Sequence, residues 1–147
     1  MSIKDMLNQD MKTALKQREK ERLSVIRMAK SAILYEEKDR LHELDDDEVI
    51  EVLSREVKKR KDSMAEYKKL QKNDVVEELR QEISILMKYL PEQMSEDEVE
   101  EIVRETISEV GAVSMKDMGT VMSKVMPKVK GRADGRLVSS ITKKLLQ

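Results

Sequence analysis

The stretch EISILMKYLPEQMSEDEVEEIV, residues 82–103, contains the end of one helical segment and the start of another. Apolar residues recur with helical spacing up to Leu90. Pro91 lacks a backbone N–H and biases the residue before it toward extended backbone, so we expect the helix to end there. Ser95 and Glu98 then form the Ser-x-x-Glu pattern of a capping box, which is typical of a helix start. The sequence therefore predicts two helical parts, 1–90 and 95–147, joined by a linker at 91–94.

Four helices are predicted before the linker. Ser2 is expected to cap the first, the second runs from about 20 to 41, Asp45 or Asp46 opens the third, and Asn73 or Asp74 caps the fourth. The residues expected to face the core are Ile3, Leu7, Met11 and Leu15; Leu23, Ile26, Ala29 or Lys30, Ile33 and Leu34; Ile50, Leu53, Val57, Met64 and Tyr67; and Val76, Leu79, Ile83, Leu86 and Leu90.

Three helices are predicted after the linker. They are expected to begin at Ser95, Ser114 and Asp134, and the first two are expected to end at Gly111 and Gly131. Their inward faces are expected to carry Val99, Ile102, Val103 and Val110; Met118, Met122, Val125 and Val129; and Leu137, Val138, Ile141 and Leu145. No segment alternates with a period of two for the length of a strand, so the predicted fold is all-α. It has an N-terminal domain of about four helices and a small three-helix tail domain, which should be marginally stable by itself.

Composition narrows the class of protein. Charged residues make up 40% of the 147 residues and hydrophobic residues 39%, whereas a typical globular domain is about 25% charged. The surface must be very polar, but the periodic apolar residues indicate a folded chain. No apolar run approaches the ~20 residues of a membrane span, and the N-terminal MSIKDMLNQDMK lacks the apolar segment of a signal peptide. We therefore expect a soluble cytoplasmic protein.

We expect no self-contained catalytic site, and we interpret the many acids as solvated helix faces, with paired carboxylates left as an open alternative. There is no cysteine and a single histidine, His42, which we expect to be exposed at a helix end. A catalytic triad and a histidine metal site both need partners for His42 that the chain lacks. No glycine-rich phosphate-binding motif occurs among the four glycines. We expect no catalytic residue, no metal and no cofactor.

Charge is distributed unevenly, although the formal net charge is only −1. Residues 92–109 hold eight acids against Arg104, a net of −7, whereas residues 116–147 hold eight basic residues against two acids, a net of +6. A further basic cluster lies in 55–72, interleaved with three acids. Whether that cluster binds a partner or is a solvated helix face is left open.

The tail contains a candidate anion site in KVKGRADGRLV, residues 128–138. Lys128, Lys130, Arg132 and Arg136 surround the glycines Gly131 and Gly135, and Lys143 and Lys144 extend the basic surface. Backbone N–H groups of the turn and the following helix N-terminus would both favour a phosphate. Only three aromatic residues occur, all tyrosine, so any nucleic acid would be bound through its backbone and shape rather than by base stacking.

Four methionines follow one another at helical spacing: Met115, Met118, Met122 and Met126. Such a stripe could line an adaptable peptide groove. We favour packing in the core of a small helical domain, because the spacing matches a buried helix face.

Two features of the sequence resemble known proteins. The tail, KDMGTVMSKVMPKVKGRADGRLVSSITKKLL at 116–146, resembles the C-terminal tail of the B subunit of the tRNA-dependent amidotransferase. The whole chain, including REVKKRKDSMAEYKK, EISILMKYLPEQMS and the tail, resembles the YqeY family of small bacterial proteins. The resemblance implies two helical domains, with a tail domain that helps to hold tRNA in the amidotransferase. It places Lys130, Gly131, Arg132, Ala133, Asp134 and Gly135 at the positions of the tail motif.

Three hypotheses of function follow. The first is a non-catalytic accessory protein that binds tRNA or another structured RNA through the tail domain, with the six basic residues on phosphates and the glycines allowing close approach. The second is an adaptor that binds a protein through the long second and third helices or the methionine stripe. The third is an amidotransferase-linked activity, a carbon–nitrogen ligase with glutamine as amido donor. It is implied by the resemblance alone, because the sequence lacks the amidotransferase's catalytic part.

Overall fold

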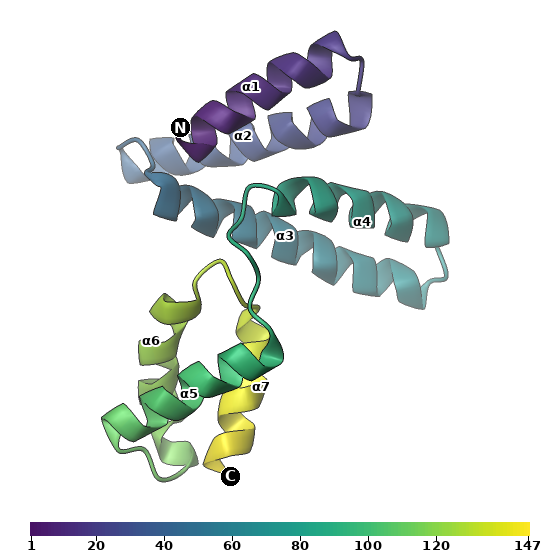
Figure 1. Cartoon of the computed structure of the whole chain (residues 1–147). Helices are drawn as coiled ribbons and strands as arrows, with labels where there is room; N and C mark the ends of the chain where they lie inside the picture. The colour runs from purple at the N-terminus through teal and green to yellow at the C-terminus, as the bar shows by residue number, and fades with distance from the viewer. The chain divides into compact units, whose positions relative to one another are not determined.

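A computed structural model describes residues 1–147 as seven α-helices and one short 3-10 helix, with no strand. The prediction of an all-α protein is therefore confirmed. The chain divides into two compact units, Met1–Leu90 with α1 to α4 and Pro91–Gln147 with α5 to α7 (Figure 1). No helix in either unit is long and apolar enough to cross a lipid bilayer.

The N-terminal unit is built from two helical hairpins. The first pairs α1 (Ile3–Lys16) with α2 (Lys20–Arg40), and the second pairs α3 (Asp46–Lys69) with α4 (Asn73–Met87) (Figure 1). Their shared core is aliphatic, with one tyrosine: Ile3, Leu7, Val25, Ile26, Ala29, Ile33, Leu44, Val49, Val52, Leu53, Val57, Leu86 and Tyr89.

Local hydrogen bonds start α1 and α3 where the sequence predicts, α2 begins at Lys20 without a side-chain cap, and one predicted cap is wrong. Ser2 and Asp45 each accept from the backbone N–H three residues on, and both form complete capping boxes. The wrong cap is that of α4, which begins after Lys72 without any side-chain cap, so neither Asn73 nor Asp74 caps it. The packing of α4 on its neighbours must then compensate for the missing cap.

Two residues predicted to face the core are exposed instead. Leu15 is 59% exposed and Leu34 is 51% exposed, whereas Ala14 and Val25 are buried. The physical reason is the position of neighbouring helices. Because α2 contacts α1 on one side and α3 and α4 on the other, its buried face is set by those partners rather than by its own apolar pattern. Leu34 lies outside that face.

The C-terminal unit packs three helices around valines. They are α5 (Glu96–Val110), α6 (Met118–Val129), which follows the 3-10 helix η1 (Met115–Asp117), and α7 (Gly135–Leu146). The fully buried core consists of Val99, Val103, Val121, Val125, Val129 and Val138. Met118, Met122 and Met126 pack against this core, while Met115 is 39% exposed. Three of the four methionines thus follow the core-packing interpretation.

Caps and glycines set the ends of these helices. Ser95 accepts from the N–H of Glu98, which is one of the two bonds of the predicted capping box, and Asp134 accepts from the N–H of Arg136. Gly111 ends α5 in the left-handed conformation with φ 68°. Ser114 caps η1 rather than α6 directly, since one turn of 3-10 helix precedes α6. The predicted helix starts at Ser95 and Asp134 are confirmed, and that at Ser114 differs by one turn. Such positions can be predicted because a cap depends on residues within one turn.

Candidate nucleic-acid interface

The candidate anion site lies in the turn between α6 and α7. Val129 ends α6, Gly131 adopts a left-handed φ of 72°, and Gly135 opens α7. Lys130 and Arg136 are exposed on either side of this turn, and Arg132 is half-buried within it. The structure therefore brings these three cations together around one tight turn.

Arg132 has a structural role in this turn. Its Nε donates to the carbonyl oxygen of Glu92 at 3.0 Å, and its own carbonyl accepts from the N–H of Met94 at 2.8 Å. Gln93 Nε2 donates to the carbonyl of Gly131 at 2.8 Å. Residues 92–94, part of the predicted linker, are thus held to the α6–α7 turn by three hydrogen bonds.

The backbone donors that we expected to bind a phosphate are engaged within the chain. The N–H groups of Arg132 and Ala133 donate to the carbonyl of Val129 at 2.9 and 3.1 Å, and that of Arg136 donates to Asp134 Oδ1 at 2.8 Å. The carboxylate of Asp134 also places a negative charge at the N-terminus of α7. A phosphate at this turn would therefore be held by side chains, because a capping carboxylate already satisfies part of the helix N-terminus.

The other predicted basic residues lie apart from the turn. Lys128 Nζ turns toward α5, where it donates to Thr106 Oγ1 at 3.0 Å and pairs with Glu109 at 3.2 Å. Lys143 and Lys144 lie in the last turn of α7, about 12 Å along the helix from Gly135 at 1.5 Å per residue. There they suit the negative end of the helix dipole. The eight predicted residues thus do not form one cluster. Lys130, Arg132 and Arg136 are the basic residues that lie at the turn.

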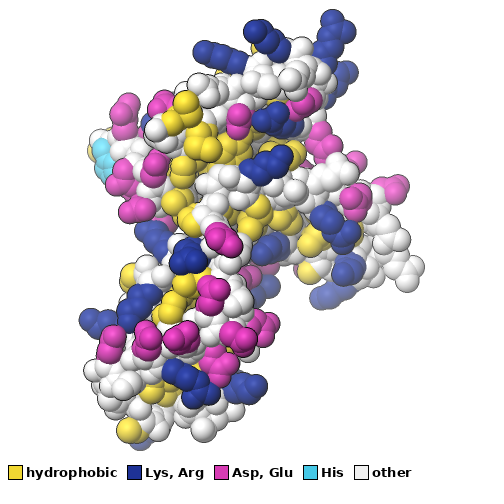
Figure 2. All heavy atoms as spheres, viewed as in Figure 1, with side chains coloured by type: hydrophobic (Ala, Val, Ile, Leu, Met, Phe, Trp, Pro, Cys, Tyr) yellow, Lys and Arg dark blue, Asp and Glu magenta, His cyan; other side chains and the backbone are white.

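Acidic residues of the same unit gather on α5. The first turn of α5 holds Glu96, Asp97 and Glu98, which suits the positive end of the helix dipole. Figure 2 shows acidic side chains in a band over this helix. The opposite charges of 92–109 and 116–147 therefore lie within one small unit, and the ion pair between Glu109 and Lys128 joins them.

His42 is exposed just after the end of α2, as the sequence predicts, and a carboxylate lies near its ring. Its side chain is 51% exposed, Nδ1 lies 2.8 Å from the carbonyl oxygen of Glu43, and Nε2 lies 3.6 Å from a Glu48 oxygen. Figure 2 shows the ring at the surface. No group of three or more histidine, cysteine, aspartate or glutamate side chains is arranged to hold a metal ion.

Sequence reasoning missed two polar centres in the N-terminal unit. Arg60, which we grouped with the surface cations of 55–72, is only 7% exposed and pairs with Glu56 and Glu82 at 3.3 and 3.2 Å. A signal was present, because Arg60 continues the helical stripe of Leu53 and Val57.

The second missed centre is Tyr89, whose hydroxyl donates to Asp10 Oδ2 at 2.5 Å. Burial and this hydrogen bond together raise the pKa of Tyr89 above its ordinary value. Asp10 also lies 3.6 Å from Arg22. The three side chains connect the end of α4 with α1 and α2, so we interpret them as a structural link.

The fold defines a small all-helical protein of two compact units. The chain belongs to the Yqey-like protein family, whose sequence pattern matches residues 4–146. The family membership predicted from the sequence is therefore confirmed.

Named relatives fall into two groups. The first contains the E subunit of glutamyl-tRNA(Gln) amidotransferase. That of Thermococcus gammatolerans is 41% identical over 58 residues, which are 37% of this chain and 9% of the relative. That of Thermococcus sibiricus is 45% identical over 49 residues, 33% of this chain and 8% of the relative. This chain thus spans less than a tenth of the amidotransferase subunits it matches.

The second group is a mitochondrial protein. Altered inheritance of mitochondria protein 41, mitochondrial, of Pyrenophora tritici-repentis is 26% identical over 136 residues. The match covers 90% of this chain and 75% of that protein, so it extends over both helical units.

Proposed function

We propose that this chain is a non-catalytic accessory protein that binds tRNA or another structured RNA through its C-terminal unit. The observation that carries the proposal is the 58-residue match to a subunit of an amidotransferase named for glutamyl-tRNA(Gln). That length is close to the length of the C-terminal unit, Pro91–Gln147. Because the match covers so little of the subunit, it supports a shared RNA-binding part rather than a shared reaction.

The charges of the α6–α7 turn support contact with phosphates. Lys130, Arg132 and Arg136 lie within seven residues of one another at this turn, and the C-terminal unit contains no aromatic residue. Stacking on bases is thus unavailable to this unit, and its affinity would come from cations placed against the RNA backbone. Such binding releases counterions, so it should weaken as salt concentration rises.

The test is a pair of charge-neutral substitutions, Lys130→Gln with Arg136→Gln, measured for binding to bulk tRNA across a salt series. We expect weaker binding and a log–log salt slope that is shallower by roughly 1.4 to 1.8, since each neutralised phosphate contributes about 0.7 to 0.9. Arg132 is left unchanged in this variant because its replacement would also remove the hydrogen bond from its side chain to the carbonyl of Glu92.

The matched control is Lys116→Gln with Lys124→Gln, which removes the same charge from exposed positions elsewhere in the unit. A third variant, Lys143→Gln with Lys144→Gln, measures whether the far end of α7 contributes. If wild-type protein shows no salt-sensitive binding, or if the turn variant binds as well as the control, the α6–α7 turn is not an RNA site.

The adaptor hypothesis is supported by a separate surface on α2, described below. The amidotransferase-linked activity ranks third, because the chain lacks a cluster of catalytic residue types. A glutaminase assay on the purified chain tests it, and turnover above the rate of a His42→Ala variant would place the chemistry at the single histidine.

A further inference from the structure

The solvent-facing side of α2 carries apolar side chains. Met28 is 52% exposed, Leu34 is 51% exposed and Tyr35 is 71% exposed. The opposite side of the same helix is buried through Val25, Ile26, Ala29 and Ile33. Helix α2 therefore has apolar residues on two faces, and the second face is largely exposed, although the sulfur of Met28 accepts from Arg60 Nη2 at 3.8 Å. Large apolar side chains gathered on one exposed face are typical of a binding surface.

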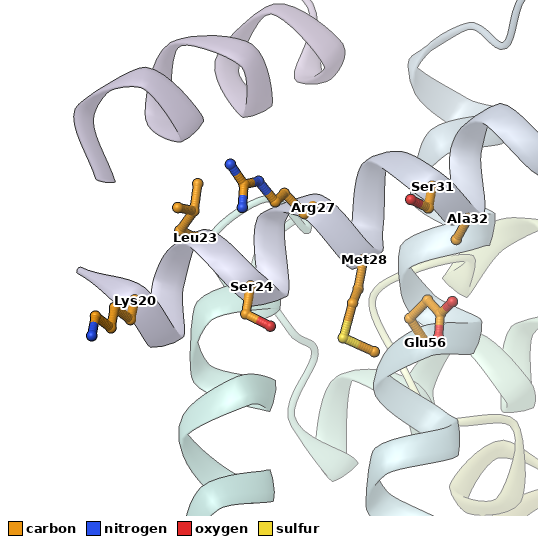
Figure 3. Close-up of a pocket in the computed structure, with 8 residues that line it drawn as sticks. All are labelled: Lys20, Leu23, Ser24, Arg27, Met28, Ser31, Ala32 and Glu56. Carbon is orange, nitrogen blue, oxygen red and sulfur yellow. The ribbon is translucent and has the colours of Figure 1, made fainter. Parts of the chain in front are cut away.

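Two hollows on this face meet at Ser31. The first, of about 640 Å³, is lined by apolar Leu23, Met28 and Ala32 and by charged Lys20, Arg27 and Glu56 (Figure 3). The second, of about 280 Å³, lies toward α1 and is lined by apolar Leu7, Ile33 and Leu34 and by Lys4, Lys30 and Glu37. Ser31 lines both hollows, and its small side chain does not fill the space between them.

The acids around these hollows are paired within the chain, whereas three of the cations are not. Glu56 shares Arg60 with Glu82, at 3.3 and 3.2 Å, and Glu37 pairs with Lys4 at 2.6 Å. In contrast, no carboxylate lies within ion-pair distance of Lys20 or Arg27, and Lys30 contacts only the sulfur of Met11, at 3.6 Å. The rim thus presents three cations without carboxylate partners around an apolar floor.

We propose that this face of α2, from Lys20 to Leu34, binds an acidic amphipathic helix of a partner protein. Apolar residues of that helix would fill the two hollows, and its carboxylates would pair with Lys20, Arg27 and Lys30. The face spans 15 residues of α2, about 22 Å at 1.5 Å per residue, which matches a partner helix of about four turns. An amphipathic helix in an apolar groove is a recurrent mode of recognition.

Two other occupants fit the surface less well. An RNA backbone would satisfy the cations but would leave the apolar floor without a complementary contact. The acidic helix of a second copy, α5, is engaged elsewhere, because its apolar residues Val99 and Val103 are fully buried in the core of the C-terminal unit.

The experiment begins with selection of displayed 16-residue random peptides against the full-length protein. We expect the enriched peptides to carry apolar residues at helical spacing, with aspartate or glutamate beside them. A synthetic copy of one enriched peptide is then titrated against variants. Lys20→Glu with Arg27→Glu should weaken its binding at least tenfold, because both cations become like charges. Ser31→Tyr should also weaken it at least tenfold, because it fills the junction of the hollows without changing the charge.

The matched control is Lys12→Glu with Lys58→Glu, which reverses two exposed cations that line neither hollow. It should change peptide affinity less than twofold, and all variants should keep the helical circular dichroism of wild type. The proposal is overturned if no peptide is enriched, if enriched peptides lack acids, or if the groove variants bind like the control.

Two further measurements separate this surface from the other occupants and from the RNA site. Loss of tRNA binding in the Ser31→Tyr variant would assign the face to RNA. Loss of wild-type self-association by that variant in sedimentation would assign it to a second copy. Either result overturns the proposal. We expect tRNA binding to be retained in the Ser31→Tyr variant and in the variant with Lys20→Glu and Arg27→Glu. The RNA proposal is then tested only by the variant with Lys130→Gln and Arg136→Gln.

Discussion

Different interactions stabilise the interior of each of the two units. In the N-terminal unit, ion pairs connect neighbouring helices: Lys4 with Glu37 at 2.6 Å, Arg55 with Glu36 at 2.9 Å and Arg60 with Glu82 at 3.2 Å. In the C-terminal unit, six fully buried valines form most of the core, and the acids and bases are segregated along the sequence. We therefore expect the stability of the first unit to depend on the charges of its side chains, and that of the second unit to depend on how well its valines are packed.

The largest effect is expected from Val103→Ala in the C-terminal unit. Val103 is fully buried, and removing two methyl groups should cost about 2–3 kcal/mol in transfer and cavity free energy. In so small a unit this is a large part of the total stability. Hydrogen exchange should show lost amide protection in 95–146 and retained protection in 1–90. The control is Val113→Ala, the same change at a side chain that is 87% exposed. Equal loss of protection in both units would show that they unfold as one body.

A smaller effect is expected from Arg60→Met in the N-terminal unit. The substitution leaves Glu56 and Glu82 without their shared cation, and both are partly buried at 19% and 23% exposure. Breaking a fully buried pair costs about 3–5 kcal/mol, so we expect about 2 kcal/mol here from urea unfolding. Arg55→Met is the matched control, because Arg55 is 53% exposed and its pair should contribute less than about 1 kcal/mol. Equal effects of the two substitutions would contradict the distinction between the two arginines.

The pH dependence of the N-terminal unit should follow Glu37. This carboxylate accepts from Lys4 Nζ at 2.6 Å and from the N–H of Leu44 at 2.8 Å. These two bonds, that of Lys4 foremost, hold the pKa of Glu37 below its ordinary value of 4.5. A folded-state pKa below the unfolded value stabilises the fold above pH 4.5, and this contribution is lost as pH falls through the lowered pKa.

Glu37→Gln should therefore lower the free energy of unfolding at pH 7 by about 1–2 kcal/mol. It should also flatten the dependence on pH below 4.5. Chemical denaturation between pH 7 and 3 measures both effects. Glu77→Gln, at a pair that is more than half exposed on both sides, serves as the control. A Glu37→Gln profile parallel to that of wild type would contradict the assignment.

Limited proteolysis tests the boundary between the units. We predict that the first cleavage falls near 91–95 and leaves a folded N-terminal fragment. Because Arg132 donates to the carbonyl of Glu92, Arg132→Ala should raise the cleavage rate there about fivefold, the equivalent of one hydrogen bond of about 1 kcal/mol. Early cleavage inside 46–72, with 91–95 resistant, would count against two separable units.

The smallest effect is expected from His42→Ala. The side chain is half exposed and lies 3.6 Å from Glu48, so the substitution should change the unfolding free energy by less than about 0.5 kcal/mol. Binding of tRNA should not change. A large loss of any activity in a folded His42→Ala protein would require a functional role for this residue.

The helix starts could be predicted because a cap is a local interaction. The side chains of Ser2, Asp45, Ser95 and Asp134 each accept from a backbone N–H two or three residues further along. The turn between α6 and α7 was predictable for the same reason, since Gly131, Gly135 and the capping Asp134 define it. Leu15 and Leu34 were predicted wrongly because helical spacing allows more than one buried face, and neighbouring helices select among them.

The sequence by itself determined the helices and their breaks, the family, and the charge of each segment, all of which depend on residues within a few positions of one another or on composition. Only the tertiary structure decided which groups the charged side chains pair with. Arg132 reaches Glu92 forty residues earlier, Lys128 reaches Glu109 nineteen residues earlier, and Arg60 of α3 reaches Glu82 of α4. It also decided that one apolar face of α2 stays uncovered. The physical reason is that burial and ion pairing depend on distance in space, which the packing of separate helices sets and no local pattern records.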